Sequence, residues 1–130
     1  MNSFKIEPTA ITPEINFDID DNTLTFLKVS KPENAIDFYK PLFDFIDQFE
    51  QKKVKPGQVE QLTIDFKFDY FNTSSAKMIH QLLGRFKKLQ QSGIKLDVNW
   101  FYRSDDDDML EDGEIISEAQ QIPFNFKALE

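Results

Sequence analysis

The sequence predicts an α/β (α+β) fold in a single domain over residues 1–130, with a mixed central sheet of about 5–6 strands and about 3 helices mainly on one face. Stretches with an apolar residue at every second position alternate along the chain with stretches in which apolar residues recur every three or four positions. These are the periods of strands and helices. In addition, a strand, a helix of about seventeen residues and another strand follow one another, which fits a right-handed crossover between parallel strands.

Three short alternating segments open the chain, at residues 4–6, 15–19 and 24–26. The tripeptide at 20–22, Asp-Asp-Asn, lies between the second and third segments. Because Asp and Asn tolerate left-handed backbone, we expect a tight turn there. The second and third segments should therefore form an antiparallel hairpin.

A first helix is expected after Ser30. Ser30 and Glu33 match a capping box, with Pro32 in the first turn, where its missing N–H costs nothing. Pro41 should kink this helix near residue 40 or divide it into two shorter pieces. The expected buried face comprises Ile36, Tyr39, Phe43, Ile46 and Phe49, with Leu42 alongside.

The longest alternating run covers residues 62–70, and a helical pattern follows it over 76–89. Between them, residues 71–75 form a strand-to-helix corner. Gly93 suits the left-handed position at the end of that helix. Residues 94–100 alternate again, so two strand–helix–strand units share the 62–70 strand and place it in the centre of the sheet.

The last third of the chain is less regular. An acidic stretch leads into a weakly helical pattern over 109–119. Gly113 is expected to interrupt this pattern. Residues 123–126 then fit a final edge strand.

The corner carries more polar side chains than one helix cap needs. Asn72, Thr73, Ser74 and Ser75 are all residue types that cap helices. One interpretation is a redundantly capped helix. The other is that one hydroxyl is a phosphorylation site, because a phosphate there would lie beside N–H groups that lack partners within the helix.

Charge is distributed unevenly. The net charge of −8 argues against nucleic acid and anionic membranes as partners. Eight of the 23 carboxylates lie between residues 105 and 118 without any Lys or Arg, and the rest of the chain is balanced. This patch is interpreted either as a solvated face or as a docking surface for a basic partner. It comprises Asp105, Asp106, Asp107, Asp108, Glu111, Asp112, Glu114 and Glu118.

Neither a nucleophile–base dyad nor a calcium-binding loop can be assembled from the sequence. There is no Cys, and the one histidine, His80, lies about 10 Å along the helix from Thr73, too far to serve as its base. A calcium loop aligned on Gly113 would need oxygen ligands at Leu110 and Ala119. We therefore expect a non-enzymatic protein without metal or cofactor, and keep weak divalent-ion binding as the lowest-ranked alternative. Without a signal peptide or an apolar run of about 20 residues, it should be soluble and cytoplasmic.

Four blocks, in order along nearly the whole chain, resemble the SiaC family of bacterial regulatory phosphoproteins. They are Thr12-Pro13-Glu14-Ile15-Asn16-Phe17-Asp18, Pro32-Glu33-Asn34-Ala35 running into Phe38-Tyr39-Lys40-Pro41-Leu42, Tyr70-Phe71-Asn72-Thr73-Ser74-Ser75, and Asp106-Asp107-Asp108-Met109 with Glu111-Asp112-Gly113-Glu114. Asn22, in place of a turn Gly, and Lys31, in place of an aromatic residue, depart from the expected pattern.

The resemblance implies a fold like the STAS domain and a function in signal transduction. It implies that Thr73 is phosphorylated by a protein kinase and dephosphorylated by a PP2C-type phosphatase. In the unphosphorylated state the protein would bind and activate a diguanylate cyclase, which links it to c-di-GMP and biofilm regulation by partner switching. The expected surroundings of the phosphosite are Tyr70, Phe71, Asn72, Ser74 and Ser75, of which the two serines are expected to cap the helix.

Two hypotheses follow. In the preferred one, the phosphorylation state of Thr73 gates binding to a signalling enzyme. In the alternative, the chain is a structural or scaffold domain that docks a basic partner through the acidic patch at 105–118, and Thr73 only caps a helix.

Overall fold

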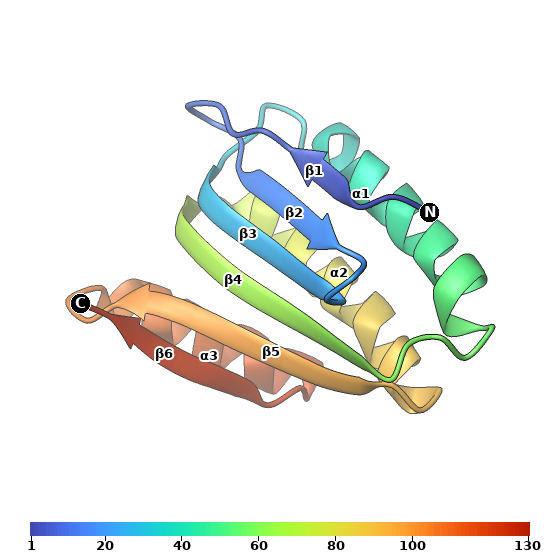
Figure 1. Ribbon diagram of the computed structural model, residues 1–130. Helices are drawn as coiled ribbons and strands as arrows, with labels where there is room; N and C mark the ends of the chain where they lie inside the picture. The colour runs from blue at the N-terminus through green and yellow to red at the C-terminus, as the bar shows by residue number, and fades with distance from the viewer.

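The computed structural model describes residues 1–130 as a six-stranded sheet with three α-helices (Figure 1). In chain order the elements are β1 (Phe4–Ile6), β2 (Glu14–Asp18), β3 (Thr23–Ser30), α1 (Ala35–Phe49), the π-helical turn η1 (Glu50–Val54), β4 (Gln61–Phe71), α2 (Thr73–Gln91), β5 (Lys95–Arg103), α3 (Asp107–Gln120) and β6 (Phe124–Leu129). None of the helices is long and apolar enough to cross a membrane.

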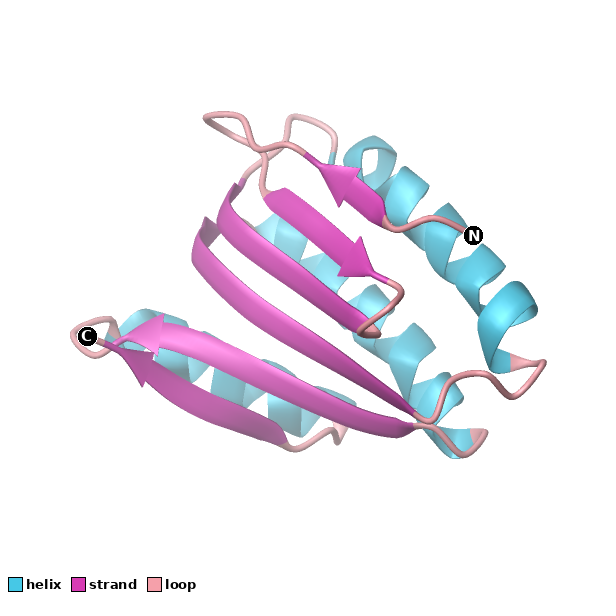
Figure 2. Ribbon diagram, in the orientation of Figure 1, coloured by secondary structure: helices cyan, strands magenta, loops and turns pink.

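The strands lie side by side in their chain order, β1 to β6. β1, β2 and β3 pair antiparallel, and Asn22 takes the expected left-handed backbone (φ 52°) in the β2–β3 turn. From β3 onward every pair is parallel, with one helix in each crossover. All three helices lie on the same side of the sheet (Figure 2). The predicted mixed sheet, helix placement and interior position of β4 are thus confirmed.

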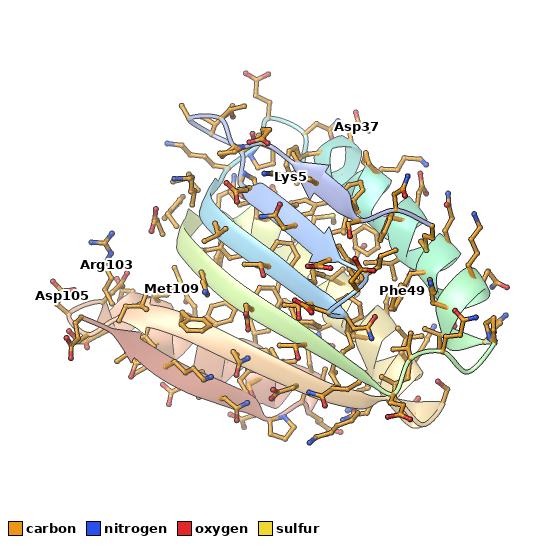
Figure 3. All side chains as sticks on the ribbon, in the orientation of Figure 1. Lys5, Asp37, Phe49, Arg103, Asp105 and Met109 are labelled. Atoms are coloured by element: carbon orange, nitrogen blue, oxygen red, sulfur yellow. The ribbon has the colours of Figure 1, made fainter.

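Aromatic side chains form the centre of the core between the sheet and its helices. Trp100 is 1% exposed and stacks on Phe124, with 5.8 Å between ring centroids, while Phe66 lies 5.3 Å from it. Because each aromatic side chain buries a large apolar area, this cluster supplies much of the hydrophobic stabilisation of the fold. Phe49, labelled in Figure 3, belongs to the same buried cluster at the end of α1.

The prediction for the start of α1 is wrong. Asn34, not Ser30, is the N-cap, and its Oδ1 accepts a hydrogen bond of 3.1 Å from the N–H of Asp37. Ser30 is instead the last residue of β3 and is fully buried. The predicted Tyr39, Leu42, Ile46 and Phe49 are buried, but Ala35 completes that face in the first turn, and Ile36, expected inside, lies on its flank and is 69% exposed.

Pro41 does not divide α1, which is continuous from Ala35 to Phe49. The proline lies on the exposed side of the helix, as does Asp37, whose carbonyl loses its intrahelical donor. Since water can hydrate a carbonyl at that side, the helix tolerates the missing hydrogen bond.

Gly113 does not interrupt α3 either. The helix runs from Asp107 to Gln120, and Gly113 lies where the Trp100 indole packs against it. A Cβ at Gly113 would come within 2.6 Å of Trp100 Cε2. The indole Nε1 also donates a 2.9 Å hydrogen bond to the carbonyl of Met109. The glycine therefore permits the close contact between α3 and β5.

Candidate functional site

The site is built around the corner between β4 and α2. β4 ends at Phe71, Asn72 caps α2, and Thr73 is the first helical residue. Asn72 Oδ1 accepts a 2.9 Å hydrogen bond from the N–H of Ser75, and the N–H of Asn72 donates to the carbonyl of Ser30 at 3.0 Å. Both ends of the corner are thus fixed, while the Thr73 side chain remains exposed.

Below the corner, three hydroxyls form a buried cluster that the sequence analysis did not identify. Ser30 Oγ lies 2.7 Å from Ser75 Oγ and 2.6 Å from the Tyr39 hydroxyl. Ser75 also donates to the carbonyl of Ser30 at 3.0 Å. The expectation that Ser74 and Ser75 cap α2 is wrong, because Asn72 is the cap and Ser75 is buried. Among the three consecutive hydroxyl residues 73–75, only Thr73 and Ser74 are exposed.

The buried cluster gives a pH-dependent stability. Burial raises the pKa of the Tyr39 hydroxyl to about 12, although its hydrogen bond to Ser30 acts in the opposite direction. An unfolded tyrosine loses its proton near pH ~10. The contribution to stability is therefore fully present below pH ~10 and falls by up to roughly 3 kcal/mol as the pH rises through the folded-state pKa.

Urea denaturation from neutral to alkaline pH measures this loss. Tyr39→Phe should show a smaller fall in stability than the unsubstituted protein, because it has no phenol to ionise and leaves Ser30 bonded to Ser75. Identical pH dependence in the two proteins would contradict the assignment.

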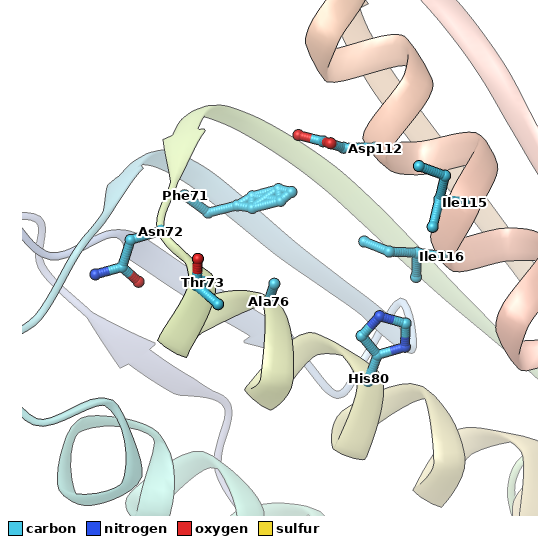
Figure 4. Close-up of a pocket in the computed structure, with 8 residues that line it drawn as sticks. All are labelled: Phe71, Asn72, Thr73, Ala76, His80, Asp112, Ile115 and Ile116. Atoms are coloured by element: carbon cyan, nitrogen blue, oxygen red, sulfur yellow. The ribbon is translucent and has the colours of Figure 1, made fainter.

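A cavity of about 240 Å³ lies between α2 and α3 and opens beside Thr73. Figure 4 shows the Thr73 hydroxyl directed into this cleft, with residues of α3 on the opposite side. The half-buried His80 of α2 lines the cleft. Its Nδ1 forms a 2.7 Å hydrogen bond with the side-chain amide of Gln120, which gives it a structural role. The lining comprises Phe71, Asn72, Thr73, Ala76, His80, Asp112, Ile115 and Ile116. We call this the Thr73 cleft.

A second groove adjoins the Thr73 cleft and shares Phe71 and Asp112 with it. Its lining comprises Asp69, Tyr70, Phe71, Asp106, Asp108, Met109, Glu111 and Asp112. We call it the acidic groove. The pKa of Asp112 is raised above its usual value, first because burial removes part of its hydration and then because of nearby carboxylates such as Asp108. The sequence analysis treated the Thr73 corner and the acidic stretch as separate sites. In the structure their surfaces are contiguous.

The acidic stretch itself divides into parts with different roles. Asp106 caps α3, accepting a 3.0 Å hydrogen bond from the N–H of Met109. Asp105, Asp107, Glu114 and Glu118 are exposed outside both grooves. Figure 3 shows Asp105 near Arg103, at the end of the sheet where β5 leads into α3. No three acidic or histidine side chains converge in a way that would hold a metal ion.

Helical periodicity was the signal that could have found this arrangement. Asp108, Asp112 and Ile115 are spaced by four and three residues, which places them on one face of a helix. The interpretation of Gly113 as an interruption concealed that face. That the face points toward Thr73 depends on the third parallel crossover, which the sequence analysis did not predict.

Comparisons with known proteins agree with this architecture. Residues 6–129 match the model for SiaC family regulatory phosphoproteins. An uncharacterized protein of Pseudomonas aeruginosa strain UCBPP-PA14 is 27% identical over 128 residues, which cover 98% of each chain.

Two solved structures from Pseudomonas aeruginosa are similar throughout. Apo-SiaC has a TM-score of 0.86 at 26% identity, over 98% of this chain and 100% of that one. A chain in the crystal structure of the diguanylate cyclase SiaD in complex with its activator SiaC has a TM-score of 0.86 at 25% identity, over 97% of this chain and 99% of that one. The resemblance drawn from the sequence motifs is confirmed, and the chain belongs to the SiaC family of regulatory phosphoproteins.

Proposed function

We propose that this protein is a non-enzymatic phosphoprotein that binds and activates a diguanylate cyclase while Thr73 is unmodified. A protein kinase phosphorylates Thr73 and thereby prevents the association, and a PP2C-type phosphatase restores it. The observation that carries the proposal is the position of Thr73, an exposed hydroxyl at the start of α2 that opens into a cleft. The relationship to the SiaC chain found with its cyclase supports the choice of partner.

The geometry supports Thr73 over its neighbours as the switch residue. Ser75 is fully buried and bonded to Ser30, so a modifying enzyme would have to unfold the corner to reach it. Ser74 is exposed but lines a different groove, toward α1. Thr73 is not needed as a cap, since Asn72 has that role, and it is therefore free to change state without loss of the helix end.

A phosphate at Thr73 would change binding more than it changes the fold. The first N–H groups of α2 and the positive end of its dipole accommodate negative charge, an effect of about 0.3–1 kcal/mol. Asp112 on the opposite wall acts in the other direction, because its carboxylate lines the same cleft. If a partner covers the cleft, the dianion loses its hydration, at a cost of several kcal/mol.

Substitution at Thr73 tests the proposal with a purified diguanylate cyclase from the same organism. Thr73→Ala should bind and activate the cyclase as the unmodified protein does, because a methyl group is easily buried. Thr73→Asp should lose at least tenfold in affinity, because a carboxylate would be desolvated. Gln58→Asp is the control, since it adds the same charge in a polar groove that shares no residue with the cleft.

Calorimetric titration and cyclase turnover are the measurements. Equal affinities for Thr73→Ala and Thr73→Asp, or no binding of the cyclase by the unmodified protein, would contradict the proposal. The scaffold alternative predicts the first of these outcomes. Salt dependence alone does not separate the two hypotheses, because the acidic groove and the Thr73 cleft share Phe71 and Asp112.

A further inference from the structure

The three most exposed large apolar side chains surround the first turn of α2. Ile36 of α1, Ile115 of α3 and Tyr70 of β4 are 69%, 55% and 52% exposed. Ile115 lines the Thr73 cleft, and Tyr70 lines the acidic groove beside it. Ile36 lines a third groove, which includes Ser74. Single apolar side chains are ordinary on a surface, but a group drawn from three elements around one point is typical of an interaction site.

Building on the proposed function, we propose that these side chains and the acidic groove form one docking surface. The occupant is a segment of the partner protein that presents apolar side chains flanked by lysine or arginine. We call Ile36, Tyr70 and Ile115 the apolar anchors of this surface. The apolar residues of the partner cover the anchors, and its basic residues lie against α3.

The charges of the acidic groove support a basic flank. No lysine or arginine of the chain pairs with Asp108, Glu111 or Asp112, and the ion pairs that do form lie elsewhere or, like Asp69 with Arg103 at 3.9 Å, at the edge of the groove. Three carboxylates of α3 therefore line or border the groove without a cation of this chain paired to them. A partner that brings cations pairs with these carboxylates and gains in association rate as well as specificity.

A phosphate on Thr73 can disrupt binding even of a basic partner. The cost of removing water from the phosphate is larger than its attraction to the cations of the partner. Thr73 lies on the apolar side of the docking surface, among Phe71, Ala76 and Ile115. A dianion about 10 Å from a partner cation in water gains roughly 0.8 kcal/mol, and salt reduces this further. Burying the dianion against apolar side chains costs several kcal/mol, so desolvation outweighs the attraction.

Site-specific photo-crosslinking in living cells tests this surface. Benzoylphenylalanine is placed at Ile36 or Ile115, and at Gln58 or Lys127 as exposed control positions on other parts of the molecule. Tandem mass spectrometry then identifies the crosslinked peptide. We expect adducts from Ile36 and Ile115 to a segment that carries lysine or arginine beside apolar residues, and none from the controls.

Charge reversal in the same crosslinking protein gives the second readout. Asp108→Lys with Glu111→Lys should reduce the yield from Ile115 at least tenfold. Asp21→Lys with Glu60→Lys makes the same change in net charge at a polar groove outside the docking surface and should leave the yield unchanged. Thermal melting of both double variants confirms that they fold.

The inference is overturned if the controls alone give adducts, if no position gives any, if the captured segment lacks basic residues, or if both double variants reduce the yield equally. Its failure is distinct from failure of the proposed function. A cyclase crosslinked only through Gln58 or Lys127 leaves the function standing and removes the docking surface. A basic segment captured from another class of protein supports the docking surface and contradicts the proposed cyclase partner.

Discussion

Gly113→Ala is expected to destabilise the protein by about 2 kcal/mol, although alanine is the better helix former by about 1 kcal/mol. The new methyl group would overlap the Trp100 ring, and overpacking a close-packed core typically costs about 1–3 kcal/mol. Relief of the overlap requires α3 to move away from β5, which also weakens the hydrogen bond from the indole to Met109. Urea denaturation followed by the fluorescence of Trp100, the single tryptophan, measures the effect.

Gly84→Ala in α2 is the matched control. A Cβ at Gly84 meets no atom within 4 Å, so only helix propensity operates and the substitution should stabilise by about 0.5–1 kcal/mol. The two glycine substitutions should therefore change stability in opposite directions. A stabilising Gly113→Ala would contradict the packing described here. Because α3 forms one wall of the Thr73 cleft, Gly113→Ala should also weaken partner binding, whereas Gly84→Ala should not.

Phosphorylation of Thr73 is expected to weaken cyclase binding at least 100-fold, which corresponds to about 2.7 kcal/mol. The physical reason is loss of hydration from the dianion once the partner covers the cleft. Titration calorimetry at low and at high ionic strength separates this cause from simple repulsion. Desolvation persists at high salt, whereas screening would abolish a purely Coulombic effect. The melting temperature should change little, because the start of α2 accommodates the charge.

Recovery of binding at high salt would contradict the desolvation account, as would a phosphorylated protein that has lost its fold. Treatment with a PP2C-type phosphatase provides the control. Removal of the phosphate should restore the original affinity in the same sample.

Most of the fold could be predicted from the sequence because its elements have clear periods. The 62–70 run alternates without exception, and the structure extends it by only one residue at each end as β4. The α2 pattern likewise predicts its buried face correctly, with Ile79, Leu82 and Phe86 all inside. Such long periodic segments are determined mainly by local burial, which a single sequence records.

The errors arose where long-range contacts decide the local structure. Ser30 and Glu33 match a capping box, but Ser30 is drawn into β3 by its hydrogen bonds to Tyr39 and Ser75. Asn34 then caps α1. Ser75 lies 45 positions from Ser30 in the chain, and local sequence patterns do not encode a contact over that separation.

The candidate site was predicted in its parts and not in its assembly. Thr73 and the acidic stretch were both identified, as was the corner that presents Thr73. Their positions on opposite sides of one cleft were not, because these follow from the β5–α3–β6 crossover and from the close packing of Gly113 on Trp100. We propose that Thr73 is the switch.

Competition for a limiting amount of cyclase tests that proposal most directly. A mixture of unmodified and Thr73-phosphorylated protein is incubated with the immobilised cyclase, and tandem mass spectrometry measures the fraction of Thr73-phosphorylated peptide in the bound and free pools. We expect the ratio of phosphorylated to unmodified peptide to be at least 100-fold lower in the bound pool than in the free pool. Equal fractions in the two pools would show that the modification at Thr73 does not control association.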